Sequence, residues 1–177
     1  DAKSGDVLAL AGLAFSAPQP PGSTFKIITA AGALEEGITT PDEEFPVVQS
    51  AIVGGREVSN AHDELCGGTL VQSFAKSCNS VFGPLGEELG GKRVVEYAEK
   101  FGLISPPSLY NEESLALVDP LTSTIPEDLT DDLAGISAIG QGEVQATPLE
   151  MASVAQTIAN DGVRSPTSIV KDPALAG

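Results

Sequence analysis

Ser23 and Lys26 lie three residues apart in the stretch PPGSTFKI, which runs from residue 20 to residue 27. A serine hydroxyl is a weak nucleophile until a base removes its proton, and a lysine is a base only when it is neutral. Its reference pKa of about 10.4 must fall by roughly 3 units for half the amine to be neutral near pH 7. Side chains at i and i+3 are neighbours on a helix. The pair indicates either a nucleophile with its base or a helix cap followed by a surface lysine.

The Ser-x-x-Lys pattern alone is weak, because two other pairs share it: Ser73 with Lys76, and Ser168 with Lys171. We expect Ser73 in the middle of a helix, where its hydroxyl bonds the preceding turn or faces solvent. No helix is predicted around Ser168. Only Ser23 follows a Pro-Pro-Gly turn and opens an apolar helix, so it is the preferred nucleophile.

Ser77-Cys78-Asn79 is the only Ser-x-Asn in the chain. Short polar side chains compete with the backbone for hydrogen bonds, so residues 77–80 predict a break between two helices. A hydroxyl and an amide at such a break could move a proton and hold a substrate carbonyl. The alternative is a helix cap without a catalytic role.

Helix signals surround both motifs. Apolar residues at helical spacing predict a helix over 24–36 that ends at Gly37. Thr69 with Gln72, and Thr147 with Glu150, have the capping-box pattern, which places helix starts at these threonines. The predicted helices that follow cover residues 70–76, 80–89, 92–101 and 148–160.

The remaining segments predict little sheet. Residues 6–15 predict a strand, residues 47–53 (VVQSAIV) a short strand, and Gly54-Gly55 a turn. The rest of 38–68 is expected to be irregular. Residues 105–132 are rich in proline, serine and acid, and predict a long surface loop.

Composition excludes several classes of protein. The 177 residues carry 9 Lys and Arg against 25 Asp and Glu, a net charge of −16, which argues against nucleic-acid binding. The sequence contains no run of 18 apolar residues, so it predicts no transmembrane helix. His62 is the only histidine, and Cys66 and Cys78 lack a zinc-ligand pattern. The two cysteines are either free thiols or, in an oxidising compartment, a disulfide.

The motifs in order resemble the penicillin-binding transpeptidases, most closely the class B enzymes of cell division and elongation. PPGSTFKI resembles their nucleophile motif and SCNS their Ser-x-Asn motif. IGQGEVQATPLEMASVAQTIANDGV, residues 139–163, resembles the stretch before their third motif, and DAKSGDVLALA the hairpin that opens the domain. The resemblance covers nearly the whole chain, and the ordered set is far more specific than any one motif.

The resemblance implies a fold and a set of roles. The fold class is α+β, a mostly helical subdomain of the serine transpeptidase and β-lactamase-like fold with a truncated antiparallel sheet. Ser23 would be the acylated nucleophile, Lys26 the general base, and Ser77 a proton relay. The substrate-binding residues would be Asn79, Gln141 and Gly142.

The activity implied is D,D-transpeptidation. An acyl-enzyme forms from the D-alanyl-D-alanine end of a peptidoglycan stem peptide and passes to an amine of another stem. Penicillins and other β-lactams trap the same serine. We expect no metal and no organic cofactor, and a site of action outside the bacterial cytoplasmic membrane, on an N-terminal anchor absent from this chain. Other cell-wall synthesis proteins are candidate partners.

The family's third motif, Lys-Thr/Ser-Gly, is absent after residue 163. Lys3-Ser4-Gly5 matches its letters but precedes the nucleophile. We therefore expect a partial domain made of a hairpin over 1–17, a helical subdomain over 18–163 and a tail over 164–177. Loss of one oxyanion donor costs on the order of 10²–10³ in rate, so this piece alone is expected to be inactive.

Two alternatives stay open at this stage. A D,D-carboxypeptidase or serine β-lactamase would use the same motifs, with water in place of the acceptor amine. A non-catalytic binding or scaffold module fits the missing third motif, although the intact serine, lysine and asparagine positions speak against it.

Overall fold

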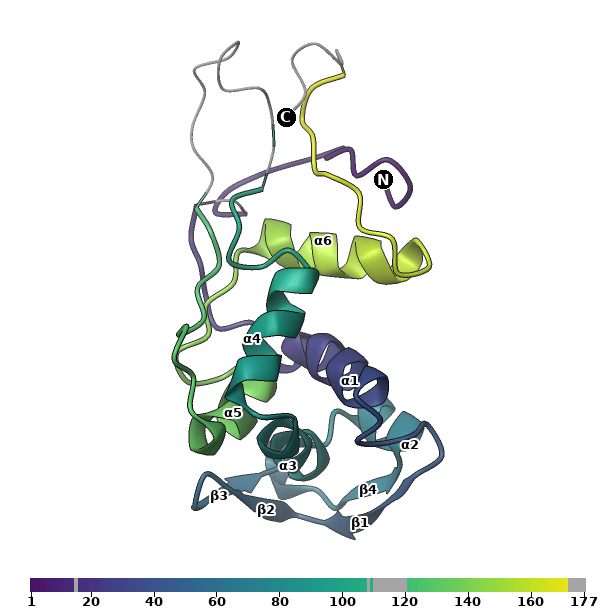
Figure 1. The fold of residues 1–177 in the computed structure, drawn as a ribbon. Helices are drawn as coiled ribbons and strands as arrows, with labels where there is room; N and C mark the ends of the chain where they lie inside the picture. The colour runs from purple at the N-terminus through teal and green to yellow at the C-terminus, as the bar shows by residue number, and fades with distance from the viewer. Residues whose placement is uncertain (15, 108, 110–120, 172–177) are drawn as a thin grey trace. The chain divides into compact units, whose positions relative to one another are not determined.

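The computed structural model describes residues 1–14, 16–107, 109 and 121–171. The chain forms two compact units (Figure 1). One unit comprises Pro20–Ala98 and Ile125–Val144, and the other comprises Asp1–Gln19, Glu99–Thr124 and Gln145–Gly177. The expected helical subdomain over residues 18–163 is therefore shared between the two units. The α+β class, with mostly helix and little antiparallel sheet, is confirmed.

Both motifs lie in the unit built from Pro20–Ala98 and Ile125–Val144, which is mainly helical. A 3-10 turn, η1 (Gly22–Phe25), runs directly into α1 (Lys26–Glu35), close to the predicted helix over 24–36. The next helices are α2 (Leu70–Lys76), α3 (Asn79–Leu89) and α4 (Gly91–Lys100). Their predicted starts and ends are confirmed to within one residue. The helix α5 (Asp131–Ala138) was not predicted.

Helix α3 is the centre of this unit and packs against α1, α5 and β2 (Figure 1). Glycines on both helices allow α3 and α5 to approach closely, because a Cβ on Gly86 of α3 would overlap Ala138 and one on Gly135 of α5 would overlap the Gly83 carbonyl. One apolar cluster joins α2, α3 and the end of α5. Its buried members are Cys66, Leu70, Cys78, Val81, Phe82, Leu85 and Ile139.

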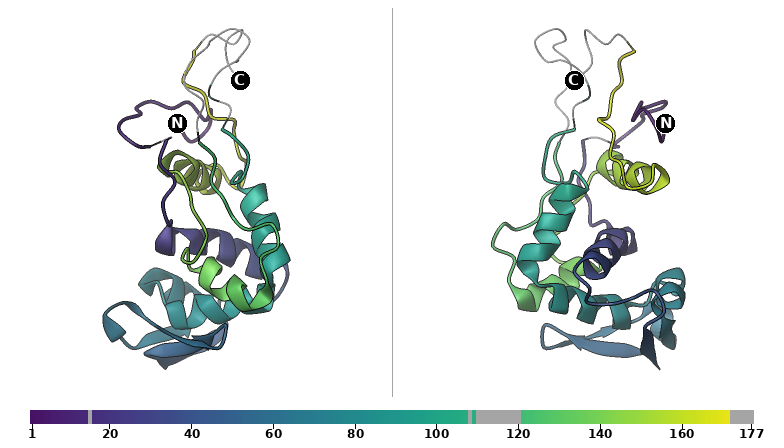
Figure 2. Two further views of the ribbon diagram at one scale, coloured as in Figure 1. Left: turned by 90° about the vertical axis from the view of Figure 1, so that its left-hand side faces the viewer. Right: turned by 45° about the vertical axis from the view of Figure 1, so that its right-hand side comes forward.

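Four short strands cover residues that were expected to be mostly irregular. Strand β1 (Glu44–Val48) pairs antiparallel with β4 (Cys66–Thr69), and β2 (Ser50–Val53) pairs with β3 (Arg56–Ser59). The predicted strand over 47–53 is divided between β1 and β2. Its two halves have different partners, which a one-dimensional pattern does not reveal. In the turned views of Figure 2 the strands stay on one side of this unit's helices.

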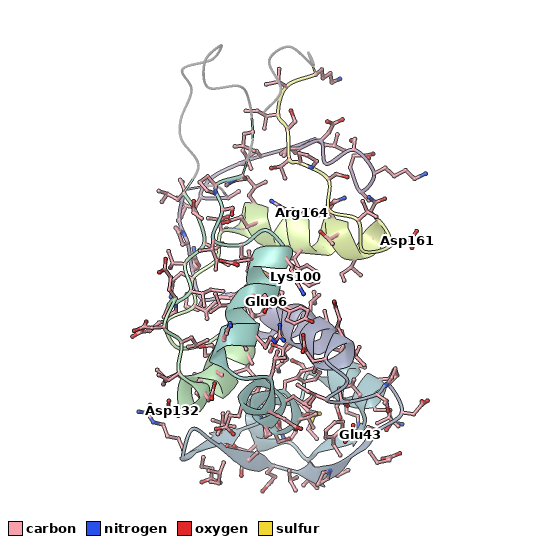
Figure 3. The ribbon with its side chains drawn as sticks, in the orientation of Figure 1. Glu43, Glu96, Lys100, Asp132, Asp161 and Arg164 are labelled. Atoms are coloured by element: carbon pink, nitrogen blue, oxygen red, sulfur yellow. A yellow bond between two sulfur atoms is a disulfide. The ribbon has the colours of Figure 1, made fainter. Side chains whose placement is uncertain are left out.

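The turn between β2 and β3 is confirmed. Gly54 and Gly55 have φ of +57° and +71°, the left-handed region that a two-residue hairpin turn requires. The hairpin ends at Ser59, and a short 3-10 turn, η2 (Ala61–Asp63), follows it. Charged side chains such as Glu43 and Asp132 are exposed at the edge of this unit (Figure 3).

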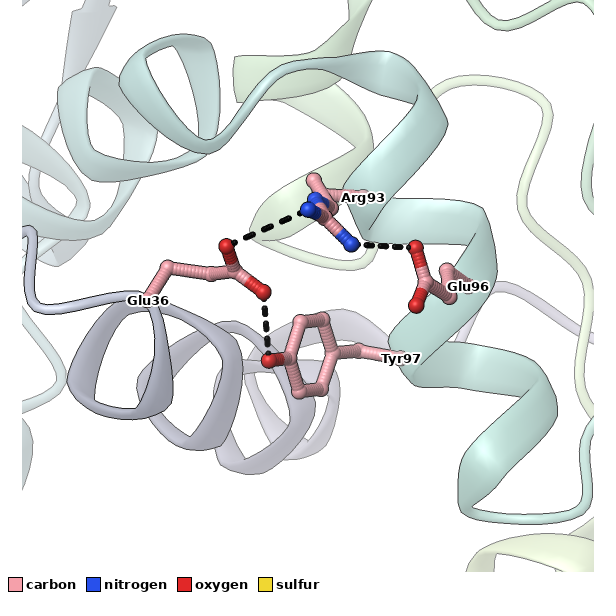
Figure 4. Close-up of polar contacts among 4 residues, drawn as sticks. All are labelled: Glu36, Arg93, Glu96 and Tyr97. Carbon is pink, nitrogen blue, oxygen red and sulfur yellow. Dashed lines mark hydrogen bonds and ion pairs between the residues drawn. The ribbon is translucent and has the colours of Figure 1, made fainter.

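A polar cluster holds the C-terminal end of α1 to α4 (Figure 4). The Tyr97 hydroxyl donates to Glu36 Oε1 at 2.8 Å, and Arg93 pairs with Glu36 at 3.5 Å and with Glu96 at 2.7 Å. Burial of the ring and the bond to Glu36 raise the pKa of Tyr97 to about 12. The same ring packs where a side chain on Gly32 would stand. This contact orients α1 from the end opposite to Ser23.

The strand predicted over 6–15 is wrong for its described residues. Asp6 makes a single parallel bridge to Ser168, with bonds from Val7 N to Ser168 O (2.8 Å) and from Ser168 N to Gly5 O (3.3 Å). A strand needs a partner along its length, and within residues 1–14 the pairing ends after this bridge. The hairpin expected over 1–17 is likewise not formed in its described part.

The unit that holds the N-terminal segment is organised around α6 (Pro148–Ala159). Thr147 caps α6 through its Oγ1, but Glu150 does not return to the Thr147 backbone, so the predicted capping box is only half formed. Instead the buried Glu150 carboxylate accepts from Thr147 Oγ1 (2.6 Å) and from the backbone of Ser123 (2.8 Å). Residues 108 and 110–120 of the predicted loop lie outside the described residues.

Candidate active site

The first element of the site is the turn that carries Ser23. Gly22 has a φ of +56°, and Thr24 Oγ1 bonds back to Pro21 O at 2.7 Å, which closes the turn before α1. Ser23 is exposed, whereas Lys26, one turn later, is 2% exposed. The hydroxyl is therefore accessible to a substrate, and the amine that follows it is shielded from water.

The second element is the connection between α2 and α3. Helix α2 begins with the predicted capping box, in which Thr69 and Gln72 bond reciprocally at 3.2 and 3.1 Å. It ends at Ser77, which has φ 62° and ψ 45°, a left-handed conformation that costs roughly 1–2 kcal/mol for a residue other than glycine. Cys78 is extended and α3 starts at Asn79. The predicted helix break is confirmed, and it turns Ser77 and Asn79 the same way.

Cys78 links the connection between α2 and α3 to the sheet. It forms a disulfide with Cys66 of β4, with a Cα–Cα distance of 5.4 Å. Of the two alternatives that the sequence left open, free thiols and a disulfide, the structure has the disulfide. The bridge ties the residue between Ser77 and Asn79 to the sheet.

Lys26 Nζ is where the two elements meet. It lies 3.2 Å from Ser23 Oγ, 3.0 Å from Ser77 Oγ, 2.7 Å from the Ser77 carbonyl oxygen and 2.7 Å from Asn79 Oδ1. The Phe82 ring lies beneath it, 5.8 Å from the centroid to Nζ. Side chains 51 to 53 residues apart in sequence thus surround one amine.

Burial determines the charge of this amine. Desolvation lowers the pKa of Lys26 from its ordinary value of 10.5 to about 8. The direction is the one that the Ser-x-x-Lys hypothesis requires, and about a tenth of the amine is neutral at pH 7. No nearby carboxylate is among the causes of the shift.

The arrangement of acceptors also suits a neutral amine. The Ser77 carbonyl and Asn79 Oδ1 can only accept, so they take two N–H groups of Lys26. A neutral amine then has no further proton to donate, and its lone pair is left for the hydroxyl of Ser23 or Ser77. In this state the serine O–H donates to the lysine, the polarity that a general base needs.

Gln141 and Gly142 are placed differently from the other predicted site residues. Both are exposed on the turn after α5, and within the described residues neither has a hydrogen bond to Ser23, Lys26, Ser77 or Asn79. Their neighbour Gly140 makes the connection instead. Gly22 N donates to Gly140 O at 2.9 Å, and a Cβ on Gly140 would overlap the Gly22 backbone.

Sequence reasoning missed three contributors to the site. Gly140 packs against the turn that precedes Ser23, the Ser59 carbonyl accepts from Asn79 Nδ2 at 2.9 Å, and Phe82 lies under Lys26. A close backbone approach and a carbonyl acceptor leave no local pattern. The run of residues 139–142, with two glycines, was the only available signal for Gly140.

The other two Ser-x-x-Lys pairs do not form such a cluster. Lys76 and Lys171 are exposed, and Ser168 Oγ bonds to the backbone of Val170. Among the described residues there is no group of three or more His, Cys, Asp or Glu placed to hold a metal ion. No helix in this part of the chain is long and apolar enough to cross a membrane.

Helices and short antiparallel strands together hold the cluster of Ser23, Lys26, Ser77 and Asn79. The sequence matches the family described as penicillin binding protein transpeptidase domain over residues 1–174, so the chain belongs to this family.

Individual relatives agree with the family match. The chain is 37% identical over 175 residues to peptidoglycan D,D-transpeptidase PbpA of Mycolicibacterium smegmatis, with 92% of this chain and 34% of the relative covered. It is 38% identical over 162 residues to penicillin-binding protein PbpB of the same species, with 88% and 24% covered. The chain thus spans about a third or less of the length of these relatives.

Solved structures give the same result. The chain has a TM-score of 0.77 and 33% identity to the penicillin G acyl-enzyme complex of M. tuberculosis penicillin-binding protein A, over 95% of this chain and 37% of that one. The TM-score to penicillin-binding protein 3 from M. tuberculosis is 0.79, with 29% identity over 99% of this chain and 42% of that one.

Proposed function

We propose that this chain is part of a serine D,D-transpeptidase that cross-links peptidoglycan stem peptides and binds penicillins. Ser23 Oγ attacks the carbonyl carbon between the two terminal D-alanines, and its proton passes to Lys26 Nζ. The C–N bond breaks, and the departing D-alanine amine receives a proton through Ser77. An amine of a second stem then attacks the ester carbonyl and loses a proton to Lys26, the C–O bond to Ser23 breaks, and Ser23 Oγ takes that proton back.

Each role has its support in the geometry. Lys26 Nζ is buried, has a pKa lowered to about 8 and lies 3.2 Å from Ser23 Oγ, which is the observation that carries the proposal. Ser77 Oγ, 3.0 Å from the same amine, is suited to relay a proton. Asn79 would bind the amide of the substrate, since its Nδ2 has a second N–H beyond the bond to Ser59.

Gln141 and Gly142 are proposed to border the substrate rather than to take part in the chemistry. They are exposed on the turn that Gly140 fixes against Gly22, beside the residue that precedes Ser23. A stem peptide extended from Ser23 would pass over this turn.

The site of action follows from the substrate. Stem peptides are joined outside the cytoplasmic membrane, so we propose that the whole protein works there, attached by a segment that this chain does not contain. The Cys66–Cys78 disulfide supports an oxidising location, because cytosolic thiols are kept reduced. Other proteins of cell-wall synthesis are the proposed partners.

The test of acylation uses the full-length protein that contains this sequence. A fluorescent penicillin should label it, and mass spectrometry of the digested protein should find the adduct on Ser23. Ser23→Ala should abolish labelling, whereas Ser73→Ala, which removes the serine of a second Ser-x-x-Lys, should retain it. No adduct on the native protein would favour the non-catalytic scaffold.

A second assay identifies the acceptor. A peptide ending in D-alanyl-D-alanine is supplied with and without a second peptide that carries a free amine. Cross-linked product in the presence of the amine supports transpeptidation. Release of D-alanine with only the hydrolysed peptide, whatever the amine concentration, would mean a carboxypeptidase.

A further inference from the structure

Asn60 is a buried amide, 5% exposed, at the end of the β2–β3 hairpin. Its Oδ1 accepts from the Ser80 backbone N–H at 2.9 Å. Its Nδ2 lies 2.9 Å from Val48 O, 3.2 Å from Glu64 O and 3.0 Å from Ser80 Oγ. Every hydrogen-bonding group of the side chain is used, which is how a buried polar side chain offsets its desolvation.

Ser59, the residue before Asn60, holds Asn79, the residue before Ser80. Ser59 O accepts from Asn79 Nδ2 at 2.9 Å, and Asn79 Oδ1 accepts from Lys26 Nζ at 2.7 Å. The Ser59–Asn60 dipeptide therefore grips Asn79 and Ser80 side by side at the first turn of α3.

This grip decides which way the Asn79 amide points. A carbonyl cannot donate, so the group facing Ser59 O must be the NH₂ of Asn79, and the oxygen must then face Lys26. If the hairpin end moved away from α3, Asn79 would lose this orientation, and Lys26 would lose one of its two carbonyl acceptors.

We propose that Asn60 is a positioning residue for the candidate active site, acting on Lys26 through Ser80 and Asn79. Its side-chain hydrogen bonds in the described structure go to Val48, Glu64 and Ser80 and not to Lys26 or Ser23, so it has no chemical step of its own. It fixes the start of α3 to two chain segments at once, the end of β1 at Val48 and the turn after η2 at Glu64. The inference rests on the proposed roles of Lys26 and Asn79.

The decisive experiment is a double-mutant cycle in the full-length protein, with the second-order rate of acylation by a fluorescent penicillin as readout. Asn60→Leu keeps the branched shape of the side chain, with the same number of heavy atoms, and removes every hydrogen bond. It should slow acylation roughly ten- to a hundredfold, because displacements of about 1 Å at a catalytic group have effects of this size. In the Asn79→Ala background, the fold-loss in acylation rate caused by Asn60→Leu should be less than a third as large.

Non-additivity of this kind separates positioning from general loosening. Residues that act through one another show an interaction term, whereas independent sites add. Equal fold-losses from Asn60→Leu in the two backgrounds would overturn the proposal.

A matched control is Val53→Ala. Val53 is fully buried in the same hairpin and packs against the same helix at Gly83, one turn after the Asn79 and Ser80 positions that Ser59 and Asn60 hold. It should lower the melting temperature and leave the acylation rate within twofold. If it slowed acylation as much as Asn60→Leu, the effect would be ordinary destabilisation and the proposal would fail.

Asn60→Asp keeps the experiment informative if Asn60→Leu does not fold. The carboxylate can still accept from Ser80 N, but it cannot donate to the Val48 and Glu64 carbonyls. Acylation should fall by an intermediate amount, with a smaller loss of melting temperature. An acylation rate equal to that of the native protein would count against Asn60.

Hydrogen–deuterium exchange tests the role of Asn60 without depending on acylation. Asn60→Leu should speed exchange of the Ser80 amide, whose acceptor within the described residues is Asn60 Oδ1, and Val53→Ala should not. If the native protein is never acylated, the proposed function fails, but the exchange measurement still tests whether Asn60 holds the start of α3. An unchanged Ser80 amide in Asn60→Leu would overturn the inference even in an active enzyme.

Discussion

The start of α1 and the end of α2 carry the same Ser-x-x-Lys letters and use them in opposite ways. At α1, Ser23 is exposed and Lys26 is buried, with the hydroxyl 3.2 Å from the amine. At α2, Ser73 is fully buried, and its Oγ has no hydrogen-bond partner in the described structure, while Lys76 is exposed. The spacing alone does not make a base. The lysine has to be the buried member of the pair.

The two regions nevertheless depend on each other. Lys76 stands in the last turn of α2, where a cation interacts favourably with the helix dipole. The last turn also supplies the carbonyls of Ser73 and Phe74, which accept from Cys78 N at 2.9 Å and from Ser77 N at 3.0 Å. The second pair thus belongs to the scaffold that turns Ser77 toward Lys26.

The largest expected difference between the two regions comes from removing each lysine. Lys26→Met should slow acylation by penicillin about 10²- to 10⁴-fold, the usual contribution of a general base. Lys76→Met should stay within twofold of the native rate. Stopped-flow fluorescence with a labelled penicillin measures both. Comparable losses in the two variants would remove the distinction drawn between the two pairs.

The pH profile should show the charge of Lys26 directly. Because the pKa of Lys26 is lowered to about 8, acylation should rise about tenfold between pH 7 and pH 9 and then level off. Lys76→Met should keep this profile, and the residual rate of Lys26→Met should be flat. A native profile with no inflection between pH 7 and 9 would contradict the assignment of the base.

The same shift has a consequence for stability. The unfolded chain has the ordinary lysine pKa of 10.5 and the folded chain about 8, so between these values the unfolded state binds more protons. The contribution of Lys26 to the free energy of unfolding should therefore increase as pH rises from about 8 to 10.5. The difference between native and Lys26→Met stability, followed by urea unfolding, should change by this contribution. The corresponding difference for Lys76→Met is the reference.

A fourth test concerns the backbone around Ser23. Gly140 and Gly37 have nearly the same φ, +72° and +71°, so an alanine at either position incurs a similar left-handed strain. Only at Gly140 would the added Cβ overlap the Gly22 backbone, whereas nothing lies within 4 Å at Gly37. Gly140→Ala should slow acylation about tenfold, since it displaces the turn before Ser23, the proposed nucleophile.

The paired variant provides the control for that test. Gly37→Ala should lower the melting temperature but leave acylation unchanged. Equal acylation rates in the two variants would show that the contact between Gly22 and Gly140 does not position Ser23.

The sequence was sufficient for the features that depend on local chemistry. The helix after Ser23, the capping box at Thr69 and the break at residues 77–80 were predicted, because capping and turn preferences act over a few residues. The meeting of Ser23, Lys26, Ser77 and Asn79 was expected from the family resemblance and not from spacing. Contacts across more than 50 residues have no local signature.

The failures share a cause. The strand over 6–15 was wrong and the strands β1–β4 were mostly missed, because pairing depends on partners distant in sequence. Asn60 was not singled out, although its four short contacts come from Val48, Glu64 and Ser80. An isolated asparagine before a turn looks the same whether its amide is solvated or buried.

The smallest expected effect on acylation comes from a change at the C-terminal end of α1. It tests whether only the first turn of α1 sets the geometry of Ser23 and Lys26. Tyr97→Phe removes the bond from the Tyr97 hydroxyl to Glu36, a loss of about 1 kcal/mol in the free energy of unfolding. Acylation should not change, because Glu36 lies beyond the last residue of α1, and Ser23 precedes its first. Urea unfolding and the penicillin rate measure the two effects separately.

The stability of Tyr97→Phe at alkaline pH tests the direction of the Tyr97 pKa shift. The pKa of Tyr97 is raised to about 12 in the folded state, above the ordinary value of 10.0. Its stabilising contribution is therefore complete below pH 10 and is lost as pH rises toward 12, in the direction opposite to that of Lys26. Tyr97→Phe should remove this loss. A slowed acylation in Tyr97→Phe would mean that the whole of α1, and not only its first turn, sets the geometry of Ser23 and Lys26.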